Sequence, residues 1–195
     1  MDINFLIEIE KGLTYTPLML AAALGEAECL KIMLTNPSLV LEATDPIAGT
    51  NAFWLAAFFG RGECVRILAN AGIDIFNCHK ESKSNALHVA IERKHYEVAN
   101  LLIGSKFPLN NKTDGGLTAL VLVARDKDAY YVGEQLVKRG AEVNLVTDFG
   151  MSALAQTVLS DNKKLAGYLL KSEAKMFNED IEWRDNSAFF VAINQ

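Results

Sequence analysis

The sequence predicts an all-helical solenoid in which short helix pairs stack side by side, and three observations lead to this fold class. A seven-residue pattern recurs six times along the chain at a nearly constant interval. A residue suited to cap a helix begins every copy, and apolar residues at helical spacing follow in the first three units. An interval of about 20 to 50 residues is typical of repeat architectures, in which each unit buries its apolar face only against its neighbours.

The recurring pattern shows where the units begin. Its starts are separated by 35, 34, 33, 34 and 35 residues. The copies read TPLMLAA from Thr16, NAFWLAA from Asn51, NALHVAI from Asn85, TALVLVA from Thr118, SALAQTV from Ser152 and SAFFVAI from Ser187. We therefore expect about five full units and a partial sixth.

The start of each copy predicts a short first helix. Thr, Asn and Ser carry a side-chain oxygen that can accept a hydrogen bond from the free amide groups of the first turn. A small residue follows, or proline at Pro17, where a missing N–H costs nothing. The next small and apolar residues are expected to face inward.

A second helix is predicted from further apolar residues at helical spacing. These residues are Cys29, Leu30, Met33, Leu34, Cys64, Val65, Leu68, Val98, Leu101 and Leu102. Turn-forming runs such as TDGG (113–116) and TDFG (147–150) precede the next unit and favour a tight hairpin.

These stretches resemble the ankyrin-repeat family. TPLMLAAALGEAECLKIML from Thr16, and GLTAL and KRGAEVN of the fourth unit, are similar to the family's helix-turn-helix signature. The resemblance covers nearly the whole chain, so residues 1–195 are interpreted as a single ankyrin-repeat domain. Only Pro17 and His88 keep the proline and histidine of the family's motif. The third unit lacks the hairpin glycine, and the fourth carries one extra residue before Gly140, which predicts an irregular turn between its helices.

The resemblance implies a curved slab of helix pairs with projecting hairpins, one concave side and one convex side. The ends of such an array need polar caps. The sixth unit stops after its first helix, at NSAFFVAINQ, and Asp2-Ile3-Asn4 is similar to the exit of a full unit. We therefore expect an excerpt of a longer array, or a tail that acts as a cap.

The composition indicates a folded globular protein, with 50% hydrophobic and 22% charged residues. The longest uncharged apolar run, residues 52–59, is too short to cross a bilayer. The first residues lack the basic start of a secretion signal, and the three cysteines are an odd number without close spacing. We expect a cytoplasmic or otherwise intracellular protein in which the cysteines are buried thiols, without direct membrane insertion.

The formal net charge of −5 is concentrated in the first part of the chain. Residues 1–79 hold nine acidic and four basic residues, whereas residues 80–195 hold fifteen of each. Lysine and arginine do not cluster anywhere, so the sequence does not predict a nucleic-acid partner.

The stretch NAFWLAAFFG (51–60) raises the question of which rings are buried. Phe53 aligns with a leucine column and is expected in the core, and Trp54 is expected to pack between neighbouring units. Phe58 and Phe59 end the first helix, where the other units carry a mixture of apolar and charged residues. Such a mixed column is expected on a recognition surface, although the two rings could instead cover one another or pack beneath Tyr15.

The resemblance implies that helix ends and hairpin tips line the concave groove. The groove residues predicted to bind a protein or peptide are Tyr15, Leu24, Ile47, Thr50, Phe58, Phe59, Arg93, Arg125, Phe149 and Met151, with Leu117 beside them. Exposed apolar groups that cluster usually mark an interaction site. We expect a partner segment with apolar anchors, flanked by lysine or arginine because the region is acidic.

Residues that could carry chemistry are interpreted as structural. The cysteines and histidines show no C-x-x-C or H-x-x-x-H spacing for a metal, and no nucleophile can be matched with a general base. The glycine pairs are too short for a phosphate cradle, and the sequon at Asn111 is read as a coincidence. We expect no catalytic residue, no metal and no cofactor.

The sequence thus predicts a non-enzymatic protein-binding module. Two alternatives stay open: a regulatory or assembly segment of a larger enzyme, kinase or channel, and a structural spacer or oligomerisation array. The exposed rings argue against a pure spacer. The partner and the oligomeric state are not predicted.

Overall fold

The computed structural model describes residues 3–10 and 13–175, which divide into two compact units, unit 1 up to Asp114 and unit 2 from Gly115. We describe each unit by itself. The predicted partial repeat at Ser187 lies outside the described residues, and the prediction of a single domain over residues 1–195 stays a prediction.

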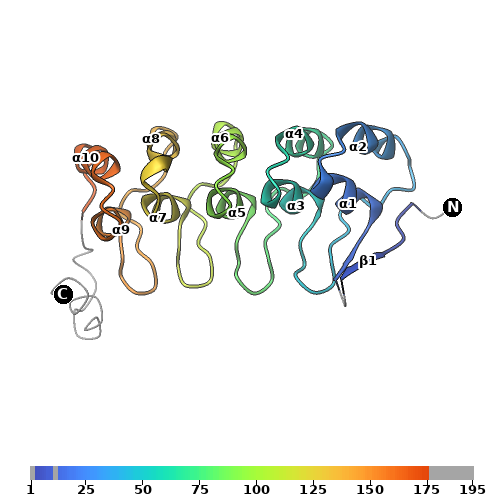
Figure 1. The fold of residues 1–195 in the computed structure, drawn as a ribbon, viewed down its shortest axis with the longest axis horizontal. Helices are drawn as coiled ribbons and strands as arrows, with labels where there is room; N and C mark the ends of the chain where they lie inside the picture. Colours follow the sequence, from blue (N-terminus) through green and yellow to red (C-terminus); the bar gives the residue numbers. More distant parts are fainter. Residues whose placement is uncertain (1–2, 11–12, 176–195) are drawn as a thin grey trace. The chain divides into compact units, whose positions relative to one another are not determined.

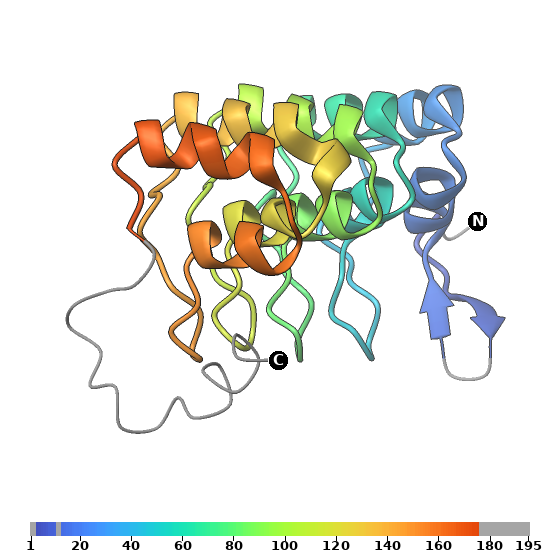
Figure 2. The ribbon, with the colours of Figure 1, turned by 60° about the vertical axis from the view of Figure 1, so that its left-hand side comes forward.

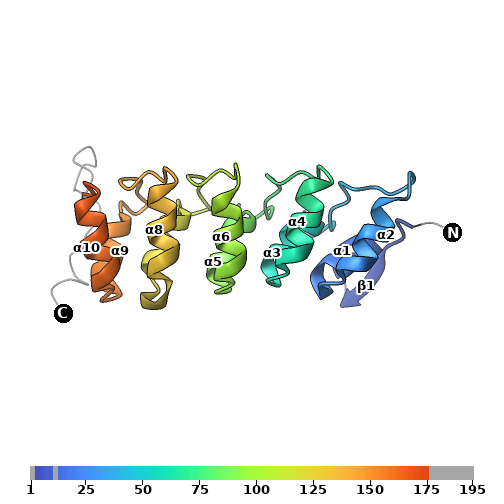
Figure 3. The ribbon, with the colours of Figure 1, turned by 90° about the horizontal axis from the view of Figure 1, so that it is seen from above.

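Unit 1 contains three helix pairs preceded by a short hairpin (Figure 1). Strands β1 and β2 pair antiparallel, with a bulge between Glu8 and Glu10. The elements are β1 (Ile7–Glu10), β2 (Leu13–Tyr15), α1 (Pro17–Leu24), α2 (Ala27–Leu34), α3 (Ala52–Phe58), α4 (Gly62–Asn70), α5 (Ala86–Glu92) and α6 (Tyr96–Gly104). The first helices pack in the order α1, α3, α5, and the second helices in the order α2, α4, α6. Figure 3 shows each second helix of this unit lying over its first helix.

The described residues of unit 2 form two more helix pairs. They are α7 (Ala119–Ala124) with α8 (Tyr130–Lys138), and α9 (Ala153–Leu159) with α10 (Lys163–Lys171). A 3₁₀ turn, η1 (Lys127–Ala129), lies between α7 and α8. This turn takes up the extra residue of the fourth unit, so the predicted irregularity is confirmed.

The predicted caps account for where the first helices begin. The side chain of each capping residue accepts a hydrogen bond from a backbone amide of the first turn, and the five residues are Thr16, Asn51, Asn85, Thr118 and Ser152. The apolar residue two positions later is buried in every case, with 1 to 3% of its surface exposed at Leu18, Phe53, Leu87, Leu120 and Leu154. The repeat alignment therefore predicted both the helix starts and the core.

Hairpins project from one side of the helices in each unit (Figure 2). In unit 1 neighbouring hairpins are joined by backbone bonds, from Lys80 N to Ala48 O (2.8 Å) and from Asp114 N to Ser82 O (2.7 Å). The third hairpin, which lacks the glycine, places Lys83 at φ 53°. A non-glycine residue thus occupies the left-handed region where the second hairpin has Gly49 at φ 70°.

The expectation that all three cysteines are buried is wrong for Cys29, which is exposed, while Cys64 is buried and Cys78 is half-buried. The repeat alignment treats Cys29 and Cys64 as equivalent. Helix α4 packs against both α2 and α6, whereas the described helices in extensive contact with α2 are only α1 and α4. One side of α2 therefore stays open, which accounts for the exposed thiol.

Candidate protein-binding surface

The ends of α1, α3 and α5 carry an exposed cluster in unit 1, which we call the aromatic patch: Leu24, Phe58, Phe59 and Arg93. Leu24 is 57% exposed and Phe59 40% exposed, whereas Phe58 is half-buried. Helix α3 packs against α1 on one side and α5 on the other, so the three helix ends are neighbours. The predicted groove residues of these helices therefore stand at the ends of adjacent helices.

Ring contacts fix Phe58 in this patch. Its ring stacks on Trp54 with centroids 5.1 Å apart and meets the Phe59 ring edge-on at 4.9 Å. The guanidinium carbon of Arg93 lies 4.0 Å from the Phe58 centroid, a distance at which a cation is attracted to the ring face. Its neighbours therefore cover much of Phe58, as the alternative interpretation expected, but a large part of Phe59 is left open.

Buried Trp54 supports the aromatic patch by stacking on Phe58. The side chain is 6% exposed, and its Nε1 donates a hydrogen bond of 2.9 Å to the carbonyl of Ser84 in the next repeat. His79 lies against the indole with ring centroids 6.0 Å apart. The expected packing role of Trp54 between repeats is confirmed.

The backbone at the helix ends is held by the following repeat. Arg61 Nε donates to the carbonyl of Ala23 (3.0 Å), and His95 Nε2 lies 3.1 Å from the carbonyl of Phe58. Gly60 has φ 71°, and a Cβ at this position would lie 2.6 Å from His95 Nδ1. The turn that follows the patch therefore fits closely against the next helix pair.

Two predicted hairpin residues of unit 1 are not on the surface. Tyr15 is 9% exposed and Thr50 is 2% exposed, so the prediction that they line a groove is wrong. Thr50 donates hydrogen bonds from its backbone N (3.0 Å) and Oγ1 (2.8 Å) to Asp45 Oδ2. These bonds turn Thr50 toward the buried carboxylate, which orders the hairpin. Ile47, at the same hairpin, is 60% exposed as predicted.

The electrostatics of this hairpin follow from burial and hydrogen bonding. Burial acts to raise the pKa of Asp45, but the amides of Ala48, Thr50 and Ile47 and the Thr50 hydroxyl outweigh it, so the pKa of this carboxyl is lowered. Burial, and then the nearby carboxylates of Asp45 and Glu10, raise the pKa of Tyr15. The charged Asp45 is thus a structural residue of the hairpin.

The predicted residues of unit 2 are spread over a helix end and a hairpin. Arg125, the residue that ends α7, is exposed, and Phe149 at the hairpin is 75% exposed. Met151 is half-buried, and its backbone N donates to Thr147 Oγ1 (3.1 Å). Leu117 is half-buried.

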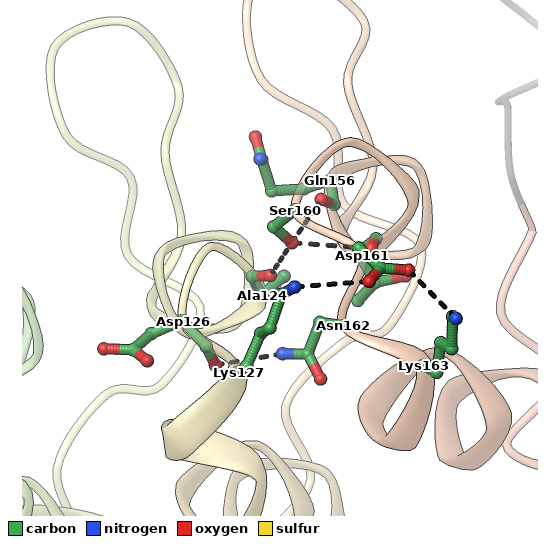
Figure 4. A network of polar contacts seen from close by, with 9 residues as sticks. Ala124, Asp126, Lys127, Gln156, Ser160, Asp161, Asn162 and Lys163 are labelled. Carbon is green, nitrogen blue, oxygen red and sulfur yellow. Dashed lines mark hydrogen bonds and ion pairs between the residues drawn. The ribbon is translucent and has the colours of Figure 1, made fainter.

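A polar network between α7 and α9 was missed by sequence reasoning (Figure 4). Ser160 Oγ donates to the Ala124 carbonyl (2.6 Å), and Asn162 Nδ2 donates to the Asp126 carbonyl (2.9 Å). Asp161 lies 3.2 Å from the ammonium of Lys127 and 3.5 Å from that of Lys163 (side-chain O to Nζ). The run of polar residues after α9 was the only sequence signal, and these contacts link residues 34 to 36 positions apart.

His88 serves as a capping residue. Its Nδ1 accepts from the Asn85 backbone N (3.2 Å), and Nε2 lies 3.0 Å from the Asn111 carbonyl. Burial lowers the pKa of His88 to about 4, against the opposing effect of the Asn111 bond. A neutral ring that accepts at Nδ1 and donates at Nε2 satisfies both neighbours.

Within residues 3–10 and 13–175, no group of three or more His, Cys, Asp or Glu side chains is placed to hold a metal ion. None of the helices in the same part of the chain is long and apolar enough to cross a membrane.

Fold and surface together define a repeat protein built from stacked helix pairs with projecting hairpins. A family model described as ankyrin repeats, in three copies, matches residues 2–77, 18–113 and 87–180. The chain belongs to the ankyrin-repeat family, whose repeats are a protein–protein interaction fold.

Relatives with a similar sequence are large proteins. The chain is 29% identical over 183 residues to neurogenic locus notch homolog protein 1 of Xenopus tropicalis, covering 86% of this chain and 7% of that protein. It is 29% identical over 180 residues to neurogenic locus notch homolog protein 2 of Homo sapiens, covering 85% and 7%. Identity to neurogenic locus notch homolog protein 1 of Homo sapiens is 31% over 146 residues, covering 74% and 6%. The chain therefore spans only a small part of the length of these relatives.

Proposed function

We propose that this chain is a non-enzymatic module that binds a partner protein or peptide through the aromatic patch, with Ile47 at the neighbouring hairpin tip. One observation supports the proposal above all: Phe59 and Leu24 remain 40% and 57% exposed on adjacent helix ends. Apolar side chains that gather on a surface and stay open to water are typical of interaction sites.

The patch also has the fixed geometry that favours binding. Trp54 and Arg93 hold the Phe58 ring, and His95 holds the carbonyl of the same residue. A rigid surface loses little conformational entropy when a partner arrives. Phe59 is thus presented on an ordered support.

The acidic excess of the first part of the chain supports the basic flanking residues that the sequence suggested for the partner segment. Residues 1–79 hold five more acidic than basic residues, since nine oppose four. We propose lysine or arginine outside the apolar anchors, because complementary charge speeds association and excludes acidic competitors. Phe149, Met151 and Arg125 are proposed as contacts on unit 2. We further propose an intracellular location, which the three free cysteines support.

A second candidate is a regulatory or assembly segment of a larger protein. It is favoured by the finding that the chain matches about 7% of the length of its notch relatives. A spacer or oligomerisation array is less well supported, because it gives no reason to keep Phe59 exposed.

The test removes the apolar groups without disturbing the fold. Phe58 stacks on Trp54, so its replacement would also affect folding, and the suitable variant is Leu24→Ser with Phe59→Ser. A partner captured from native lysate and then purified should bind this variant more weakly by about 2 kcal/mol or more, as expected for anchor residues. The matched control is Leu159→Ser, which changes a 44% exposed leucine at the end of α9. Equal affinity of all three proteins for the partner would refute the proposal.

A further inference from the structure

We infer that Arg93 selects the partner of the aromatic patch by pairing with a carboxylate placed next to the partner's apolar anchor. This inference rests on the proposed function and specifies the chemistry of the segment that binds. The observation behind it is that Arg93 is fixed beside the exposed rings while its own charge is left unpaired among the described residues.

The position of Arg93 is set by Phe58. The guanidinium carbon lies 4.0 Å from the ring centroid, and Arg93 directly follows the last residue of α5. Stacking on a ring face leaves the edge of a guanidinium, with its N–H donors, free to bind in the plane. A carboxylate is the group that this fork of donors binds in two places at once.

Nothing in the described part of the chain neutralises this charge. Arg93 is exposed and forms no ion pair with another described residue. Arg93 is instead held over a ring face, whereas ion pairs are formed among the described residues by Lys31, Lys127, Lys138 and Lys163. An ordered cation without a counterion beside an apolar surface is suited to bind an acidic group of a partner.

The distances limit where the acidic residue can stand in the partner. Phe58 lies 4.9 Å from Phe59 (ring centroids) and 4.0 Å from the Arg93 guanidinium, so Phe59 and Arg93 are no more than about 9 Å apart. An extended segment covers about 9 Å in three residues, and a helical one brings residues three or four apart together. We therefore expect Asp or Glu within four positions of an aliphatic or aromatic residue.

The two kinds of charge act at different ranges. The acidic excess of residues 1–79 acts on the partner as a whole and is screened within about 10 Å at ordinary salt concentration. Arg93 lies over the Phe58 ring and acts on one group of the partner. A basic segment that carries one carboxylate near its anchor satisfies both.

The experiment is a selection from a phage-displayed library of random twelve-residue peptides on the immobilised full chain. Four proteins are compared: wild type, Leu24→Ser with Phe59→Ser, Arg93→Gln, and Arg139→Gln. Arg139 is the matched control, because it directly follows the last residue of α8 as Arg93 follows that of α5, is also exposed, and is not among the proposed contacts. We expect wild type and Arg139→Gln to enrich peptides with Asp or Glu within four positions of an apolar residue, and Arg93→Gln to lose that preference.

A second measurement works on the peptide side. Replacing the enriched Asp or Glu by Asn or Gln should weaken binding to wild type about tenfold and leave binding to Arg93→Gln unchanged. This comparison holds even if Arg93→Gln lowers the stability of the patch, because the wild-type arm needs no protein variant. Arg93→Lys should restore part of the affinity, since it keeps the charge without the fork.

The outcomes separate the inference from the proposed function. Peptides enriched on wild type through Phe59 and Leu24 but without a carboxylate preference would overturn the inference and leave the proposed function standing. Peptides that bind equally to the Leu24 and Phe59 variant, or no enrichment on wild type, would contradict both.

Discussion

In both units the backbone carbonyl at the end of a first helix is bound by the following repeat, but the side chains beside it differ. In unit 1 the carbonyl of Phe58 is held by His95 of the following repeat, and in unit 2 the carbonyl of Asp126 is held by Asn162. His95 and Asn162 both directly precede a second helix. Because a residue of the next repeat satisfies the helix end, the residue beside it is free to vary. In unit 1 the residue after Phe58 is exposed Phe59, whereas in unit 2 the residue after Asp126 is Lys127, which pairs with Asp161 at 3.2 Å (Nζ to Oδ2).

This difference indicates which helix ends are available to bind a partner. The polar side chains after α9 are engaged with their own chain, as Ser160, Asp161 and Asn162 show. Leu24 at the end of α1 and Phe59 after α3 remain exposed, and the exposed Val158 and Leu159 of α9 lie before this polar run. Three changes should affect the two units differently, and acid should have the largest effect.

The largest effect is expected from acid and should be greatest in unit 1, where His88 lies on α5. The folded-state pKa of His88 is about 4, below the ordinary value of 6.5. Between pH 6.5 and 4, His88 is therefore protonated in the unfolded chain but neutral in the folded protein. The free energy of unfolding is unaffected by the titration of this group above pH 6.5. It falls by roughly 3 kcal/mol in total as the pH drops to about 4.

The measurement is hydrogen exchange of amides in α5 and α9 at several pH values, corrected for intrinsic rates. Protection should fall in α5 much more than in α9 between pH 6.5 and 4. The control is His88→Gln, because glutamine at this position can still accept from the Asn85 amide but does not titrate. An equal loss in both helices, or an unchanged pH dependence in the variant, would disprove the assignment.

The second effect concerns the turn after the patch. Gly60→Ala places a Cβ at φ 71° and only 2.6 Å from His95 Nδ1, so it should cost about 2 kcal/mol of unfolding free energy. Urea denaturation measures this cost. The matched variant is Asp161→Ala, because Asp161 occupies the same turn position in unit 2 at φ 51° and already has a Cβ. A Gly60→Ala protein as stable as Asp161→Ala would show that the close fit is not needed.

The smallest effect concerns the hairpins. Lys83→Gly should stabilise the protein by about 1 kcal/mol, because glycine adopts φ 53° without the steric cost of a side chain. Gly150→Ala, at φ 75° in the equivalent position of unit 2, should destabilise it by a similar amount. Thermal melting of both variants gives the sign. A destabilised Lys83→Gly protein would mean that the lysine side chain makes a larger contribution than its backbone costs.

Much of the fold could be predicted because the determinants are local. Caps such as Asn51 act within one helical turn, and a core residue such as Phe53 recurs at the repeat interval. The exposure of Leu24, Ile47 and Phe59 followed from the same alignment.

The errors arose where a residue depends on contacts outside its column. Thr50 is buried because it bonds to Asp45 across the hairpin, and Cys29 is exposed because one side of α2 has no described helix against it. The Ser160 bond to Ala124 spans 36 residues and joins a side chain to a backbone group, for which a repeat pattern gives no signal. Equal positions in a repeat have equal surroundings only when their neighbours are also equal.

Within each unit a helix pair packs mainly on the pair before it and the pair after it. A helix pair that contacts only its neighbours can be duplicated, lost or exchanged during evolution while the rest of the array keeps its contacts. The residues that touch a neighbouring pair must then match it, whereas a partly exposed residue at a helix end, such as Phe59, is less constrained. New recognition can therefore arise at the ends of the first helices without rebuilding the scaffold.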